Sequence, residues 1–157
     1  MTTLRDQLVA TALDWENRYG NAPAITSVLS EYDAAMLIGM SEEEYSAAMR
    51  GVTAVQRGFD FIHSGKRYQV KGSRPSGKAG SKVTLVSKAK NYEWDSLIWI
   101  LYDCKYVIME AWSWEVEKYK SAHHELDRIR PIHIRNGVSL SFLQKSRARL
   151  GLSEDAQ

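Results

Sequence analysis

The fold of this chain of 157 residues is decided by the stretch Arg57-Gly-Phe-Asp-Phe-Ile-His-Ser-Gly-Lys-Arg-Tyr-Gln-Val-Lys71. Two runs rich in β-forming residues, 59–63 and 66–71, flank the pair Ser64-Gly65. Serine and glycine are typical of tight turns, and turn residues between two such runs predict a β-hairpin. The rest of the sheet and its helices are expected to assemble around this hairpin.

The hairpin places polar side chains on one side. Alternate residues of a strand share a face, so Gln69 and Lys71 point one way while Tyr68 and Val70 point the other. Asp60 lies on the first strand, within reach of the second across the turn. A carboxylate, a carboxamide and an ammonium group can therefore meet beside a small sheet whose other side is apolar.

The same residues resemble the motif of the PD-(D/E)xK nucleases, a superfamily with the restriction-endonuclease-like fold. These proteins carry an acid on one strand and an acid-x-Lys triplet on the next; Asp60 takes the first place and Gln69-Val70-Lys71 the second. Phe59 stands where proline is usual. Gln69 replaces the acid, a variant found in branches such as modification-dependent restriction nucleases. The resemblance covers about residues 28–112.

The resemblance implies an α/β fold with a mixed β-sheet flanked by helices around a restriction-endonuclease-like core. Residues 1–157 would form one nuclease-like domain. Its parts would be a helical N-terminal region (1–50), a sheet core with the active site (51–112) and C-terminal helices (113–157). The implied activity is that of a DNA endonuclease that hydrolyses phosphodiester bonds with Mg²⁺ or Mn²⁺.

The implied catalytic residues are Glu31, Asp60, Gln69 and Lys71. Mg²⁺ prefers oxygen ligands. Asp60 would be the main ligand, Glu31 the second carboxylate, Gln69 an amide ligand and Val70 a backbone carbonyl ligand. Lys71 would position the attacking water and stabilise the developing negative charge. An ordinary surface glutamate at position 31 and an ordinary edge-strand cation at position 71 are the alternatives.

Positive charge is concentrated next to the motif. Residues 1–60 contain 4 Lys or Arg and 9 Asp or Glu, whereas residues 61–92 contain 8 basic residues and no acidic residue. Such a block is typical of a surface that contacts a phosphate backbone, although a solvated basic loop is the alternative. DNA is the expected partner, and the residues expected to bind it are Arg67, Arg74, Lys78, Lys82, Lys88 and Lys90.

Other patterns give the remaining elements. Apolar spacing predicts helices over 4–19, 24–38 and, after a capping box at Ser41, 42–50, with Glu31 on the second. Further predictions are a strand over 51–57, a segment at 83–89 that is either strand or short helix, and a buried strand over 96–102. The last predictions are a strand over 106–112, a helix over 114–124, a strand-like piece over 132–135 and a helix over 141–150.

Composition excludes several classes of protein. No apolar run approaches the roughly 20 residues that a membrane helix needs, and residues 1–20 lack the layout of a signal peptide. Cys104 is the only cysteine, so a disulfide framework and a cysteine-built zinc site are excluded. The glycines of 72–82 do not form a phosphate-binding Walker motif, and no nucleotide cofactor is expected. A cytoplasmic protein is the simplest expectation.

Three hypotheses about function remain open. The first is an active nuclease; because a duplex has two strands and each site cuts one, such a nuclease is expected to act as a homodimer through the helices 4–19 and 142–150. Gln69 favours a second hypothesis, a catalytically impaired nucleic-acid-binding protein of the same fold. A structural protein with a chance match to the motif is the third. Convergence of Asp60, Gln69 and Lys71 in space separates the first two from the third.

Overall fold

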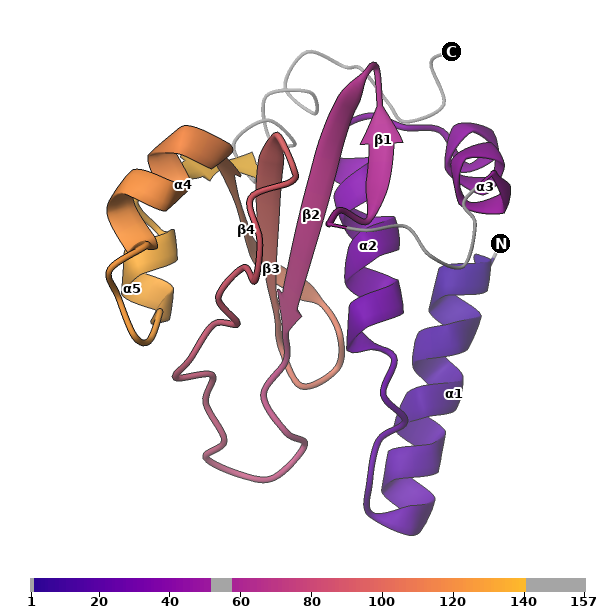
Figure 1. The fold of residues 1–157 in the computed structure, drawn as a ribbon. Helices are drawn as coiled ribbons and strands as arrows, with labels where there is room; N and C mark the ends of the chain where they lie inside the picture. Colours follow the sequence, from indigo (N-terminus) through magenta and orange to yellow (C-terminus); the bar gives the residue numbers. More distant parts are fainter. Residues whose placement is uncertain (1, 52–57, 141–157) are drawn as a thin grey trace, which may run out of the picture.

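The computed structural model describes residues 2–51 and 58–140. Five strands form a mixed sheet in the order β1-β2-β3-β4-β5, with helices on both faces (Figure 1). The predicted α/β class and mixed sheet are confirmed. The helices are α1 (Leu4–Tyr19), α2 (Thr26–Leu37), α3 (Glu42–Arg50), α4 (Val116–His123) and α5 (Pro131–Ile134). The strands are β1 (Phe61–His63), β2 (Lys66–Ser73), β3 (Ser96–Tyr102), β4 (Ile108–Glu115) and β5 (Val138–Ser139).

Local signals set the ends of the N-terminal helices. A capping box formed by Thr3 and Asp6 begins α1, and Gly20, with a φ of 87°, ends it. A second capping box, Ser41 with Glu44, begins α3. In each box a side-chain oxygen accepts a backbone N–H that has no partner within the helix. The predicted helices over 4–19, 24–38 and 42–50 are confirmed, the second over the shorter range of α2.

The predicted hairpin forms, but its first strand is shorter than the predicted run 59–63, so Asp60 precedes β1. Ser64 and Gly65 both have positive φ, 50° and 76°. Two successive residues with positive φ are characteristic of the type I′ turn, whose twist matches that of the flanking strands. β1 pairs antiparallel with β2, and β2 then runs parallel to β3, with Gln69 opposite Leu97. The sequence 66–73 therefore joins the hairpin to the centre of the sheet.

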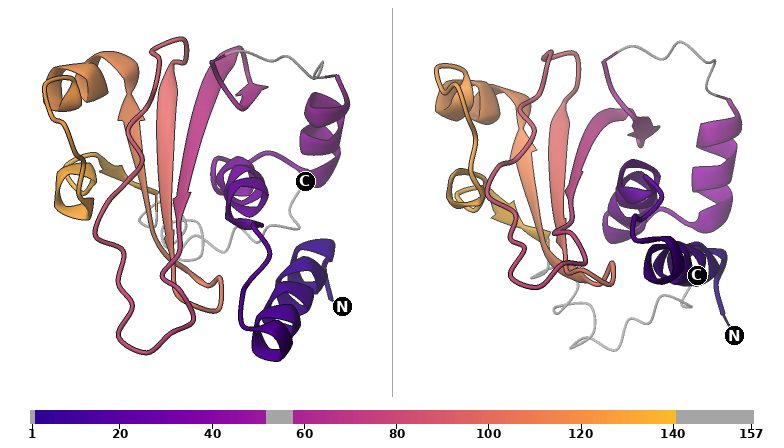
Figure 2. Two further views of the ribbon diagram at one scale, coloured as in Figure 1. Left: turned by 60° about the horizontal axis from the view of Figure 1, so that its bottom comes forward. Right: turned by 90° about the horizontal axis from the view of Figure 1, so that it is seen from below.

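The sheet separates two hydrophobic cores. Figure 2 shows α1, α2 and α3 on one face and α4 and α5 on the other. The predicted buried strand 96–102 is confirmed as β3, and its side chains alternate between the two cores. Leu29, Phe61, Val70, Ile98 and Ile100 belong to the core under α2, and Trp94, Leu97, Trp99, Trp114 and Tyr119 belong to the core under α4.

The crossover from β2 to β3 contains no helix. Segment 83–89, expected to be a strand or a short helix, is neither, and its one β-bridge joins Val86 to Ile129. Trp94 of this crossover is only 1% exposed. Its ring packs edge-on against Tyr119, and its indole N–H donates to the carbonyl of Asn91. The crossover thus covers the sheet with its own side chains.

Two predictions for the C-terminal part are corrected. The helix expected over 114–124 begins only at Val116, because Trp114 and Glu115 continue β4 opposite β3. The piece expected to be strand-like over 132–135 is the short helix α5. Pro131 occupies its first turn, where a missing N–H costs nothing and the fixed φ suits a helix. The predicted strand over 51–57 and the helix over 141–150 lie almost entirely outside the described residues.

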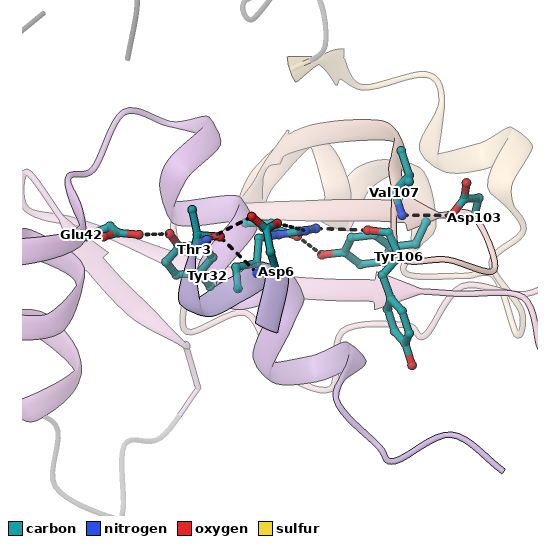
Figure 3. A network of polar contacts seen from close by, with 10 residues as sticks. Thr3, Asp6, Tyr32, Glu42, Asp103, Tyr106 and Val107 are labelled. Atoms are coloured by element: carbon teal, nitrogen blue, oxygen red, sulfur yellow. Dashed lines mark hydrogen bonds and ion pairs between the residues drawn. The ribbon is translucent and has the colours of Figure 1, made fainter. Parts of the chain in front are cut away.

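A buried ionic network ties α1 to the sheet. Arg5 of α1 donates two hydrogen bonds to Asp33 of α2, at 2.6 and 2.8 Å. The Tyr102 hydroxyl of β3 donates to the same carboxylate at 2.6 Å, and Arg5 also donates to the Tyr106 carbonyl. Figure 3 shows this region together with the capping contacts of Thr3. Asp33 is 4% exposed, so its charge is held by partners rather than by water.

The approach of α2 to β2 depends on a glycine. A Cβ atom on Gly72 would lie 2.7 Å from both Cβ and Oγ of Ser30. We expect Gly72→Ala to lower the free energy of unfolding by about 1–3 kcal/mol, because the helix must move away from the strand. Urea unfolding measures the change. Gly51→Ala is the control, since its added Cβ would meet carbonyl oxygens at an ordinary 3.5 Å; equal losses in both variants would contradict the prediction.

Candidate active site at the edge of strand β2

Asp60 lies where the pairing of β1 with β2 ends. Its backbone N–H donates to the carbonyl of Tyr68 at 2.8 Å. Beyond this bond, the side chain of Asp60 accepts the hydrogen bonds that a neighbouring strand would otherwise accept from β2. The Oδ2 atom accepts the backbone N–H of Val70 at 2.7 Å and the side-chain amide of Gln69 at 3.0 Å. A carboxylate thus takes the place of a strand along this part of the β2 edge.

The backbone of Val70 faces the same edge. The N–H and C=O groups of one strand residue point to the same side. Because the Val70 N–H reaches Asp60, the Val70 carbonyl oxygen also points away from β3, while its side chain is buried in the core under α2. An oxygen of the backbone is therefore available at this edge, as the resemblance implies for a metal ligand.

Glu31 approaches the site from helix α2. Burial, together with the neighbouring carboxylate of Asp60, raises the pKa of Glu31 to about 7. The two side chains are close enough for a side-chain hydrogen bond between them. Two carboxyl groups so close together share a proton more readily than they carry two negative charges. A divalent cation is the other means of making the pair stable.

Lys71 completes the group. Burial raises the pKa of Asp60, while the N–H of Val70, the charge of Lys71 and the contact with Glu31 act in the opposite direction. Lys71 is therefore near enough to act on the Asp60 carboxylate through its charge. The structure brings Glu31, Asp60, Gln69, Val70 and Lys71 together, from one helix and two adjacent strands.

Sequence reasoning missed Tyr45 of α3. Burial, followed by the charges of Glu31 and Asp60, raises the pKa of its hydroxyl to about 12. The ring lies against Phe61, the first residue of β1, with a centroid distance of 6.4 Å. Tyr45 therefore forms part of the wall next to the acidic pair. The sequence placed Tyr45 on the predicted helix 42–50, but nothing in the sequence placed it beside Asp60.

Asp33, the other acid of α2, does not join the site. Its oxygens accept from Arg5 and Tyr102, which are the contacts of the buried network. Within residues 2–51 and 58–140 there is no group of three or more His, Cys, Asp or Glu side chains suited to a metal. A cation here would rest on two carboxylates, an amide oxygen and a backbone carbonyl.

This donor set fits a magnesium ion. Mg²⁺ commonly binds one or two carboxylates and completes its shell with water and substrate phosphate. The hydrogen bonds that Asp60 accepts from Gln69 and Val70 both end on Oδ2. Burial is the largest cause of the raised pKa of both Glu31 and Asp60.

The six basic residues expected to contact DNA fall into two groups. Arg67 pairs with Asp95, Lys88 donates to the carbonyls of His124 and Leu126, and Arg74 is bound to Glu16 with its side chain 7% exposed. These three already serve the fold. Lys78, Lys82 and Lys90 are exposed and present their charge to solvent.

No protein-family model matches this chain, and the comparison with curated proteins finds no relative. Among the described residues no helix is long and apolar enough to cross a membrane.

A pH dependence of stability follows from Glu31. Its pKa is about 7 in the fold against 4.5 as the ordinary value. Between these values the unfolded chain loses a proton that the folded chain keeps, so the free energy of unfolding falls as the pH rises and stays low above about 7. In EDTA, Glu31→Gln should therefore raise the free energy of unfolding at about pH 8 by on the order of 2 kcal/mol.

The control for this prediction is pH itself. Near pH 4 both states of the wild type are protonated at Glu31, and the difference between the two proteins should shrink towards zero. Guanidinium unfolding at both pH values measures it. A difference of the same size at both would contradict the role of Glu31 ionisation.

Proposed function

We propose that the protein is a divalent-metal-dependent endodeoxyribonuclease with a restriction-endonuclease-like core. The observation that carries the proposal is the convergence of Asp60, Gln69, Val70 and Lys71 at the edge of β2, with Glu31 supplied by the preceding helix. A chance match of the motif gives no reason for a glutamate 29 positions before Asp60 to lie beside it. The mixed sheet with a helix packed behind β2 is the arrangement that the resemblance implies.

The proposed roles follow from the chemistry of each group. Asp60, Glu31, Gln69 and the Val70 carbonyl would hold Mg²⁺ or Mn²⁺. Such a cation supplies neutralisation of phosphate charge and lowers the pKa of a bound water. Lys71 orients the attacking water by hydrogen bonding and stabilises negative charge on the phosphate oxygens. The Val70 N–H and the Gln69 amide hold the Asp60 carboxylate in place.

A second function is favoured by one contact. Gln69 directs its amide N–H, not its oxygen, at Asp60, and a carboxylate can only accept such a bond. In this orientation Gln69 stabilises the Asp60 carboxylate by a hydrogen bond instead of offering an oxygen to a cation. A nucleic-acid-binding protein of the same fold with impaired cleavage is therefore the alternative.

The test is a cleavage assay on several DNA substrates. Supercoiled plasmid, linear duplex, methylated duplex and branched DNA are incubated with the protein in Mg²⁺, in Mn²⁺ and in EDTA. We expect hydrolysis of at least one substrate with either cation and none in EDTA. Binding without cleavage of every substrate would support the alternative, and neither binding nor cleavage would contradict both.

Gln69→Glu separates the two roles of the amide. A third carboxylate within 3.0 Å of Asp60 should lower the stability of the metal-free protein, because like charges crowd a half-buried site. The same change should tighten Mn²⁺ binding about tenfold or more by adding a charged ligand. Thermal unfolding with and without Mn²⁺ measures both effects. A variant whose unfolding temperature responds to Mn²⁺ as the wild type does would show that position 69 does not face the cation.

A further inference from the structure

An exposed pair of aromatic rings lies on the outer end of α1. Trp15 is 52% and Tyr19 60% exposed, and their ring centroids are 4.7 Å apart. The other four tryptophans, Trp94, Trp99, Trp112 and Trp114, are buried or half-buried. Large rings left in water on an otherwise polar helix end are unusual, since most aromatic surface is buried on folding.

A cationic loop is anchored to the same part of α1. Arg74, at the start of the loop, donates two hydrogen bonds of 3.0 Å to Glu16, the residue next to Trp15. Arg74 also donates to the Cys104 carbonyl and lies 4.2 Å from the centre of the Tyr106 ring. Gly77 packs so closely against Glu16 that an added Cβ would lie 2.5 Å from its Oε1 atom. The loop is thus held against the helix at two points.

The tip of this loop has a defined shape. Ser76 donates its backbone N–H to the Ser81 hydroxyl at 3.0 Å, and Ser81 donates its own to the Lys78 carbonyl at 3.2 Å. Lys78 and Lys82 are exposed on either side of this turn. Glu16, which follows Trp15 on the helix, is paired with Arg74, and this pairing lowers the pKa of Glu16. Lys78 thus follows directly on Gly77, which packs against Glu16, the residue next to Trp15.

We propose that Trp15 and Tyr19, with Arg18, Lys78 and Lys82, form a binding surface for single-stranded nucleic acid. Bases have apolar faces that stack on aromatic side chains, and the backbone between them is anionic. The bases of a duplex are already stacked on each other, so the rings would have no role in binding one. Asp14, exposed on α1, is the nearby acid that such a strand must avoid. The inference deepens the proposed function by giving it a substrate with an unpaired strand.

The test uses the full chain in EDTA, so that binding is measured without cleavage. The probes are fluorescein-labelled oligo(dT) and a labelled duplex of equal length. Trp15→Ala/Tyr19→Ala should bind oligo(dT) about tenfold or more weakly, and the duplex nearly as well as the wild type does. Trp15→Phe/Tyr19→Phe, which keeps both rings, should retain most of the affinity. Oligo(dT) should quench the tryptophan fluorescence of the wild type but not that of Trp15→Phe.

The contribution of Lys78 and Lys82 is tested by the salt dependence of oligo(dT) affinity. Lys78→Ala/Lys82→Ala should reduce the slope of log affinity against log salt by up to about two phosphate contacts. Lys118→Ala, on the opposite face of the sheet, is the control and should leave the slope unchanged. Equal oligo(dT) affinity of the wild type and of Trp15→Ala/Tyr19→Ala would overturn the proposal.

The competing occupant of the aromatic face is a second copy of the chain. A light-scattering mass that is dimeric for the wild type and monomeric for Trp15→Ala/Tyr19→Ala would overturn the proposal in favour of a homodimer contact. A failure of the proposed nuclease activity would give a different result from a failure of this binding surface. Ring-dependent binding of oligo(dT) without cleavage of any substrate would leave this surface in place and remove only the catalytic function.

Discussion

Replacing Lys71 by methionine should reduce DNA cleavage by roughly 100-fold or more while leaving the fold intact. The ammonium group of Lys71 interacts electrostatically with the Asp60 carboxylate, and the side chain is half-exposed at the edge of β2. Its replacement therefore removes a cation from the site and little packing from the core. Initial rates on the best plasmid or branched substrate measure the effect. Lys118→Met, which removes an exposed cation on α4, is the matched control.

Asp60 should give a loss of the same size, and the structure shows which variant to use. Asp60→Ala would strip the Val70 N–H of its acceptor and add a structural defect. Asp60→Asn keeps an oxygen for that N–H and removes only the charge. Its unfolding temperature should stay near that of the wild type. Cleavage at the wild-type rate by Lys71→Met or Asp60→Asn would show that the motif is a coincidence.

Replacing Asp33 by alanine should lower the free energy of unfolding by about 3–5 kcal/mol. The carboxylate is 4% exposed and accepts from both Arg5 and Tyr102, so its removal leaves a guanidinium and a hydroxyl without their partner inside the protein. Helix α1 depends on this contact for its position. Urea unfolding followed by circular dichroism measures the change.

The control for Asp33 is another acid from the same region. Asp14 is exposed on α1, and Asp14→Ala should change the free energy of unfolding by less than about 0.5 kcal/mol. If Asp33→Ala cost no more than Asp14→Ala, the buried network would contribute nothing to the stability of the fold.

The parts of the fold that were predictable are those set by neighbours in sequence. The Ser64-Gly65 turn, the capping box at Ser41 and the apolar run of β3 each act over a few residues, and each predicted element is present. The motif also placed Asp60 beside Gln69, because a hairpin with a two-residue turn fixes which residues face each other.

The parts that were not predictable depend on contacts between distant residues. Arg5 and Asp33 are 28 positions apart, and nothing local to either shows that one neutralises the other. Arg74 had the signature of a DNA contact until its pairing with Glu16 was visible. Pro131 begins a helix rather than ending one because the preceding chain is already extended, with Arg130 at a ψ of 160°.

The central claim, a divalent cation held by Asp60 and Glu31 at the β2 edge, is tested most directly by crystallography with Mn²⁺. Crystals of Lys71→Met with bound DNA and Mn²⁺ should show an anomalous difference peak within coordination distance, about 2–2.5 Å, of an Asp60 oxygen and the Val70 carbonyl. A DNA phosphate oxygen should complete the shell. A clear DNA complex with manganese bound elsewhere, and no peak beside Asp60, would contradict the account.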